Sequence, residues 1–174
     1  MPDKQTDEAV TEAFALVGGL STGFASLEFH LQFILVLFIS GKEDSSEAFL
    51  TIRDRQFSQK IQLLKDFVVL KFPKGDDLRT EGLALVKTLD SLRMKRNLFI
   101  HGYWLINEGV LATTGGIRCS DTRWKFDKKT EEWASLETHD FSLTELHKQI
   151  RENKAAFDAL YQYNQNVLGV IAPQ

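Results

Sequence analysis

Apolar side chains that recur at every third or fourth position are the strongest constraint on how this chain folds. Between residues 6 and 40 this spacing predicts one long amphipathic helix, because a period near 3.6 places the apolar residues on one face. Gly41 follows directly and predicts the end of that helix. The residues expected on the buried face are Phe14, Val17, Phe24, Leu27, Leu31, Ile34 and Phe38.

The same spacing predicts three further helices. They are expected at residues 46–72, at 77–107, and from the SLTE segment at 142–145 to about residue 168. Pro73 and Gly75 predict the turn before the third helix, and Asp76 or Asp77 is expected to cap it. In SLTE, Ser142 and Glu145 have the spacing of a capping box, in which each bonds the other's backbone amide.

Residues 110–138 have a different pattern, with glycine pairs, threonines and alternating apolar and polar residues. This pattern predicts a small antiparallel β-hairpin with turns at Gly115-Gly116 and near residues 127–130. The expected fold class is therefore mainly α: a bundle of four to five helices with a β-hairpin insertion before the last helix. At 174 residues the chain is expected to form a single domain, residues 1–174, with its own core.

Charge and hydropathy point to a cytoplasmic protein without a membrane partner. The apolar run FILVLFI, residues 33–39, is far shorter than the roughly 20 residues of a membrane span, so we expect it to be buried in the core. The acidic N-terminal segment is unlike a signal peptide. Cys119, the single cysteine, cannot form an intrachain disulfide. A net charge of −3 provides no overall attraction for nucleic acid, so phosphate binding would require a local basic patch.

Arg96 occupies a position on the third expected helix that should be apolar. The stripe with alternating spacings of four and three contains Leu85, Leu89, Leu92, Arg96, Phe99, Tyr103 and Ile106. Moving a guanidinium into an apolar interface costs several kcal/mol unless partners compensate its charge. Three explanations remain open for Arg96: a salt bridge with Glu28 or Asp90, a solvated cleft, or an interface between subunits.

A polar strip is expected beside that stripe, because Asp90, Arg93, Asn97 and His101 follow one another at helical spacing. Each of these residues also has an ordinary structural interpretation. Arg93 could belong to a solvated face, Asn97 could be a plain polar position, and His101 could bond a neighbouring carbonyl. Tyr103 could be a core aromatic.

The segment RNLFIHGY, Arg96 to Tyr103, resembles the R-x4-H signature of the HEPN superfamily (higher eukaryotes and prokaryotes nucleotide-binding domains). It also resembles the R-x4-H-x-Y form of HEPN toxins that are paired with minimal nucleotidyltransferase antitoxins. Asn97 is the polar residue that commonly follows the arginine in this superfamily. The resemblance implies a HEPN-like helical bundle, and the β-hairpin is a departure from the minimal form.

The resemblance implies a metal-independent endoribonuclease that acts as a homodimer through the third helix. Arg96 and His101 would be catalytic, and the apolar stripe around Arg96 would form the dimer contact. Asn97 would orient His101 or bind substrate, Tyr103 would bind phosphate or be modified by an antitoxin, and Arg93 would guide RNA. The four histidines are scattered, so no metal site and no cofactor are expected.

Two other functions are compatible with the sequence. One is a catalytically inactive HEPN-like module that binds nucleotide, RNA or a protein partner. The other is a helical scaffold in which the R-x4-H spacing is accidental. The expected hairpin also carries basic and aromatic residues, which could contact RNA or pack onto the bundle: Arg118, Arg123, Trp124, Lys125, Phe126, Lys128, Lys129 and Trp133.

Overall fold

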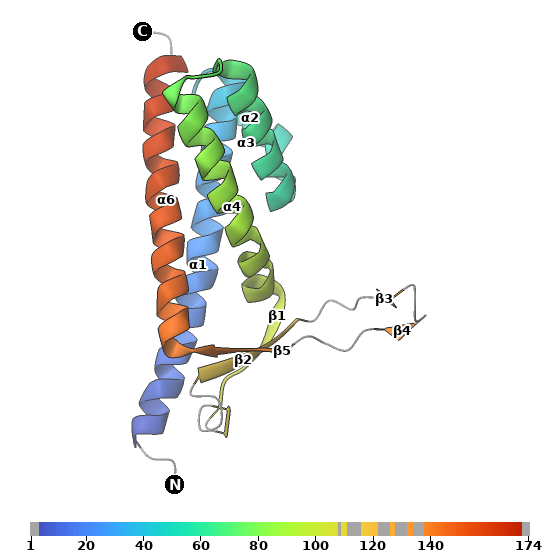
Figure 1. The fold of residues 1–174 in the computed structure, drawn as a ribbon, viewed down its shortest axis with the longest axis vertical. Coiled ribbons are helices and arrows are strands. Elements are labelled where there is room, and N and C mark those ends of the chain that lie inside the picture. Colours follow the sequence, from blue (N-terminus) through green and yellow to red (C-terminus); the bar gives the residue numbers. More distant parts are fainter. Residues whose placement is uncertain are drawn as a thin grey trace. The chain divides into compact units, whose positions relative to one another are not determined.

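The computed structural model describes residues 4–107, 109–110, 116–121, 126–127, 132–133 and 138–171. This part of the chain is mainly helical, as the sequence predicts, with five helices and a small antiparallel sheet (Figure 1). The helices are α1 Lys4–Ser40, α2 Ser46–Ile52, α3 Phe57–Lys71, α4 Asp77–His101 and α6 Leu143–Ile171. The extents of the first and last helices therefore agree with the sequence pattern, while those of the second and third differ from it. Phe14, which was expected on the buried face of the first helix, is 58% exposed.

The chain divides into two compact units. The first contains Met1–Thr22 and Lys95–Arg151, and the second contains Gly23–Met94 and Glu152–Gln174. Helices α1, α4 and α6 contribute residues to both units, whereas α2 and α3 belong to the second and the three-stranded sheet to the first.

The second unit has an apolar core built from helix faces. The run FILVLFI supplies much of it, since residues 34–38 are at most 2% exposed. The expected burial is confirmed for these five residues but not for Ile39, which is 43% exposed. Phe38 on α1 stacks on Phe67 of α3, with ring centroids 5.5 Å apart. On α4 and α6 the buried residues keep the helical spacing of the sequence: Leu85, Leu89 and Leu92, then Ala156, Leu160, Tyr163 and Val167.

The single helix predicted over residues 46–72 is wrong, because α2 and α3 are separated by residues 53–56. Lys60 on α3 is 1% exposed, and its Nζ donates to the Arg53 carbonyl at 3.2 Å and to Glu28 Oε1 at 2.9 Å. Gln56 is the N-cap residue of α3, and its backbone amide donates to Gln59 Oε1 at 2.9 Å. The break is therefore stabilised by a buried lysine that bonds a carbonyl at the end of α2.

Within the described residues, α1 is the one helix whose length and composition would allow it to cross a membrane. Residues Asp7–Ser40 contain a window with a mean hydropathy of 1.6. Half of that window is buried inside the structure. A core helix of a soluble protein has these properties, and so does a signal sequence near an N-terminus, so the helix alone does not assign the chain to a membrane.

The first unit contains a three-stranded antiparallel sheet in the order β1–β2–β5 (Figure 1). The strands are β1 Gly102–Leu105, β2 Gly116–Asp121 and β5 Thr138–Ser142. A separate pair, β3 Phe126–Asp127 and β4 Glu132–Trp133, is also antiparallel. The register aligns Trp104, Cys119 and His139 across the three strands.

The third helix ends at His101 rather than at residue 107, so the sheet begins before the expected 110–138 segment. Gly102 is required at this junction, because a Cβ there would collide with Cys119 Sγ and the Leu98 carbonyl oxygen. Phe99 stacks on Trp104 at 5.0 Å, and Trp104 Nε1 donates to the Phe99 carbonyl at 3.2 Å. Strand pairing and this aromatic contact therefore override the helical periodicity that the sequence shows beyond residue 101.

The expected turn at Gly115-Gly116 is also corrected, since Gly116 is the first residue of β2 and Gly115 lies outside the described residues. A Cβ at Gly116 would collide with the Phe141 carbonyl oxygen on β5, so the glycine serves close strand pairing. The turn near residues 127–130 lies almost entirely outside the described residues.

Both predicted helix caps are confirmed. At α6 the Ser142 amide donates to Glu145 Oε2 at 2.8 Å, and the Glu145 amide donates to Ser142 Oγ at 3.2 Å. The bonds that the Ser142 amide and hydroxyl donate to Glu145 Oε2 lower the pKa of the Glu145 carboxyl. At α4 the Leu78 amide donates to Asp76 Oδ1 at 2.8 Å, so Asp76 is the capping residue.

Candidate active site

The R-x4-H segment forms the last two turns of α4 and continues directly into β1. Arg96, Asn97 and His101 are on the helix, and all three belong to the first unit. Asn97 and His101 are four residues apart and therefore share a helix face, as predicted. Tyr103 is on β1, so the prediction that it continues the Arg96 stripe of a helix is wrong.

Arg96 is half-buried, and its Nη1 donates to Asn97 Oδ1 at 3.3 Å. Asn97 therefore contacts the guanidinium of the residue before it. The two carboxylates considered as partners for Arg96 each bond a basic residue of the second unit. Glu28 Oε1 lies 2.9 Å from Lys60 Nζ, and Asp90 Oδ1 lies 2.8 Å from Arg93 Nε.

Arg93 belongs to the second unit, unlike the other four candidate residues. Its side chain is partly exposed and is held by Asp90, one turn earlier on α4. Such an exposed pair contributes little to stability. It does neutralise much of the positive charge that would attract RNA to Arg93.

His101 is the last residue of α4, and it is exposed. Tyr103 is 63% exposed, so the interpretation of this residue as a core aromatic is wrong. An imidazole and a phenol are therefore both accessible to solvent within three residues of each other.

The apolar residues of the expected stripe are already buried within the chain. Leu85, Leu89, Leu92 and Phe99 are between 0% and 5% exposed, so they cannot form a contact with a second subunit. Near the motif, the exposed large apolar side chains of the first unit are Tyr103, which belongs to the expected stripe, and Ile100 and Leu105, which do not. A subunit contact at this end of α4 would have to use those residues.

The sheet face next to Tyr103 carries a charged pair that the sequence did not predict. Burial alternates along β1, so Tyr103 and Leu105 share the exposed face. The register places Arg118 opposite Leu105, and Asp140 opposite Arg118. Arg118 Nε and Nη2 donate to the two Asp140 oxygens at 2.7 and 2.9 Å. This bidentate bond lowers the pKa of the Asp140 carboxyl.

The sequence signal for this face was the order Gly-Tyr-Trp-Leu at residues 102–105, in which a glycine is followed by residues that favour strands. Of the other basic and aromatic residues of the expected hairpin, Arg123, Trp124, Lys125, Lys128 and Lys129 lie outside the described residues. Phe126 and Trp133 are paired partners in the β3–β4 ladder.

Cys119, His30 and His147 each contact neighbouring residues of their own unit. Cys119 is buried, and its Sγ lies 3.8 Å from the Leu98 carbonyl oxygen. His30 packs edge-on against Phe157, and His147 Nε2 lies 2.9 Å from Glu12 Oε1. In the part of the chain that the structure describes, no three His, Cys, Asp or Glu residues are grouped so that they could hold a metal ion.

No family model, curated protein or solved structure matches this chain. The resemblance to HEPN proteins therefore depends on residues 96–103 and on the helical layout.

Proposed function

We propose that this protein is a metal-independent endoribonuclease of HEPN type that acts as a homodimer. The observation that carries the proposal is the arrangement at the end of α4. Arg96 and Asn97 are hydrogen-bonded there, and His101 is exposed on the same helix face as Asn97. The exposed Tyr103 follows two residues later.

The proposed reaction uses the 2′-hydroxyl of the RNA as the nucleophile. It attacks the adjacent phosphorus, the bond to the 5′-oxygen breaks, and the products are a 2′,3′-cyclic phosphate and a 5′-hydroxyl. A base must remove the 2′ proton, and an acid must protonate the departing oxygen. His101 can transfer protons near neutral pH, and Arg96 can bind the phosphoryl oxygens through its guanidinium.

A dimer would supply both proton-transfer groups, because each chain contributes one His101 to a shared site. The contact would use the exposed Ile100, Tyr103 and Leu105 instead of the buried stripe. This arrangement keeps the proposed partner surface at the end of α4 and agrees with the burial of Leu89 and Leu92.

The proposed setting is the cytoplasm, in a toxin–antitoxin or phage-defence system. The Tyr103 side chain is accessible enough for a nucleotidyltransferase-like antitoxin to reach it. A modification there would add a bulky anion two residues from His101 and would obstruct RNA binding.

The test is incubation of the purified protein with RNA in the presence of a metal chelator, with cleavage followed on denaturing gels. We expect the wild type to cleave, and we expect Arg96→Ala and His101→Ala each to reduce the rate by at least about 100-fold. The matched control is His147→Ala, which removes an exposed histidine bound to Glu12 and should cleave as the wild type does.

Three results would contradict this proposal in different ways. Cleavage that persists in both variants would exclude the assigned residues, and cleavage that requires added metal would exclude the mechanism. A dimeric wild type that cleaves no RNA would instead favour the catalytically inactive HEPN-like module.

A further inference from the structure

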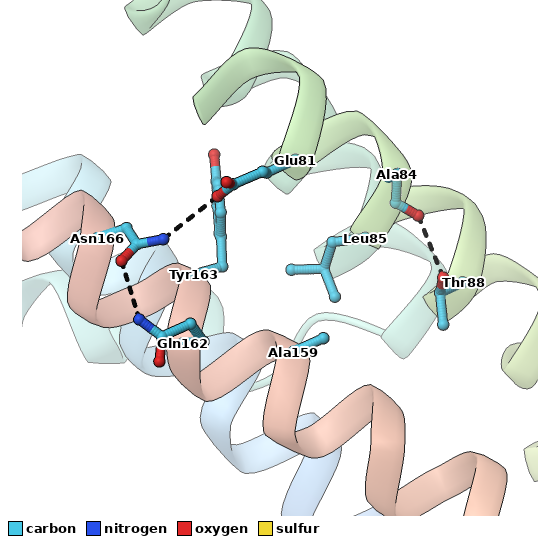
Figure 2. A pocket seen from close by; sticks show the side chains of 8 residues that line it. All are labelled: Glu81, Ala84, Leu85, Thr88, Ala159, Gln162, Tyr163 and Asn166. Carbon is cyan, nitrogen blue, oxygen red and sulfur yellow. Dashed lines mark hydrogen bonds between the residues drawn. The ribbon is translucent and has the colours of Figure 1, made fainter. Parts of the chain in front are cut away.

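A groove between α4 and α6 in the second unit has the size and composition of a small-molecule site. Its volume is about 340 Å³, within the range of about 300 to 1,000 Å³ that is common for such sites. Figure 2 shows the lining side chains, which come from these two helices: Glu81, Ala84, Leu85, Thr88, Ala159, Gln162, Tyr163 and Asn166.

The floor of the groove is apolar and contains small residues. Leu85 is buried, and Ala84 and Ala159 leave space on the two helices that face each other across it (Figure 2). Tyr163 forms a wall and is 3% exposed. Its phenol fits against α4 because residue 82 is glycine, where a Cβ would lie 2.5 Å from the Tyr163 hydroxyl oxygen.

Hydrogen bonds link the polar side chains of the groove in a series that ends at the Glu81 carboxylate (Figure 2). Gln162 Nε2 donates to Asn166 Oδ1 at 3.0 Å, and Asn166 Nδ2 donates to Glu81 Oε2 at 3.3 Å. The side-chain amides of Gln162 and Asn166 therefore each donate one hydrogen bond to another lining residue. Glu81 Oε1 and Gln162 Oε1 remain as acceptors, and none of the described lysines, arginines or histidines pairs with Glu81.

The Tyr163 hydroxyl is buried and has no hydrogen-bond partner in the described part of the chain. It lies toward the Glu81 carboxylate in Figure 2. Burial, followed by the negative charges of Glu81 and Asp76, raises the pKa of Tyr163, so the phenol stays neutral. This end of the groove therefore has the Tyr163 hydroxyl buried in its wall and the exposed Glu81 carboxylate at its edge, with which none of the described basic residues pairs.

We propose that this groove binds a small organic cation, an ammonium or guanidinium group carried on an apolar stem. The cationic group would donate to Glu81 Oε1 at the edge of the groove. The stem would lie on Ala84, Leu85 and Ala159. An anion would be repelled by Glu81, and a neutral molecule of the same size would form no ion pair with it.

The first experiment titrates the full chain with four probes of similar size, followed by amide chemical shifts in NMR. The probes are n-butylammonium, n-butylguanidinium, n-butanol and butyrate. We expect saturable shifts at the groove residues for the two cations, at least fivefold weaker binding of the alcohol, and no binding of butyrate. Equal binding of the amine and the alcohol, or no saturable shift with either cation, would overturn the proposal.

Variants distinguish this groove from other acidic surfaces. Glu81→Gln should bring the affinity for the amine down to that for the alcohol, and Ala159→Leu should fill the groove and abolish binding of both. The control is Asp54→Asn, because the Asp54 side chain is 84% exposed and distant in sequence from both helices; it should leave binding unchanged. Unaltered amine binding by Glu81→Gln would overturn the proposal. RNA cleavage is not part of these measurements, so their outcome is independent of the proposed nuclease function.

Discussion

The α2–α3 break and the α4–β1 junction are the two places where the helical pattern of the sequence continues but the helix does not. At the first, the buried Lys60 bonds the Arg53 carbonyl and reaches Glu28, which is 32 residues away in sequence. At the second, Gly102 lets Cys119 approach the end of α4, and Phe99 stacks on Trp104. The end of α2 is determined by a buried charge, and the end of α4 by close packing and strand pairing.

Lys60→Met removes the charge that stabilises the first of these two places, and we expect the largest loss of stability from it. The partly buried Glu28 carboxylate would lose the Lys60 ammonium, and the carbonyl of Arg53 would lose a donor. The free energy of unfolding should fall by about 3 kcal/mol. Urea denaturation followed by circular dichroism measures this change.

Lys154→Met is the matched control, because it removes the lysine of an exposed pair with Asp158. The change in unfolding free energy should stay within about 0.5 kcal/mol. Equal effects of the two substitutions would show that the buried pair does not determine the α2–α3 break.

Gly102→Ala tests the second place and should cost about 2 kcal/mol, since the added methyl group collides with Cys119 Sγ and a backbone oxygen. Gly169→Ala is the comparison on α6, where a Cβ meets nothing within 4 Å. That substitution should stabilise the protein by about 0.5 to 1 kcal/mol, because alanine favours a helix. Denaturant titrations of both variants measure these changes in the free energy of unfolding. A neutral Gly102→Ala would mean that β1 does not approach β2 as described.

The smallest change in stability is expected at Tyr163, whose side chain packs against Gly82 of α4. The folded state raises the pKa of Tyr163 above its ordinary value near 10, so the unfolded chain ionises first as the pH rises. This residue therefore contributes stability below pH 10, and that contribution is lost progressively above it.

Tyr163→Phe removes the ionisable hydroxyl and the unpaired buried polar atom together. At pH 7 the free energy of unfolding should change by less than about 1 kcal/mol. Above pH 10 the variant should lose less stability than the wild type, which thermal unfolding across pH 8 to 11 would reveal. Tyr161→Phe, at an exposed tyrosine on the same helix, should follow the wild type. Parallel pH profiles for Tyr163→Phe and the wild type would contradict this assignment.

The candidate site was predictable as a set of residues but only partly as an arrangement. The positions of Arg96, Asn97 and His101 on α4 follow from helical spacing, and the structure places them there. The position of Tyr103 depends on residues 118–121, with which β1 pairs, and those residues are not adjacent in sequence. For the same reason the ion pair of Arg118 and Asp140, which are 22 residues apart, could not be predicted.

By itself, the sequence determined the helices and their caps. Apolar spacing and capping side chains act within a few residues of each other, as at Asp76 and at Ser142 with Glu145. Only the tertiary structure decided where two of the predicted helices stop. The residues that determine these ends, Lys60 and Gly102, contact Glu28 and Cys119, which are far away in the sequence. Contacts between residues far apart in the sequence produce no periodic pattern. Neither the groove at Glu81 nor the exposed face of β1 could therefore be predicted from the sequence.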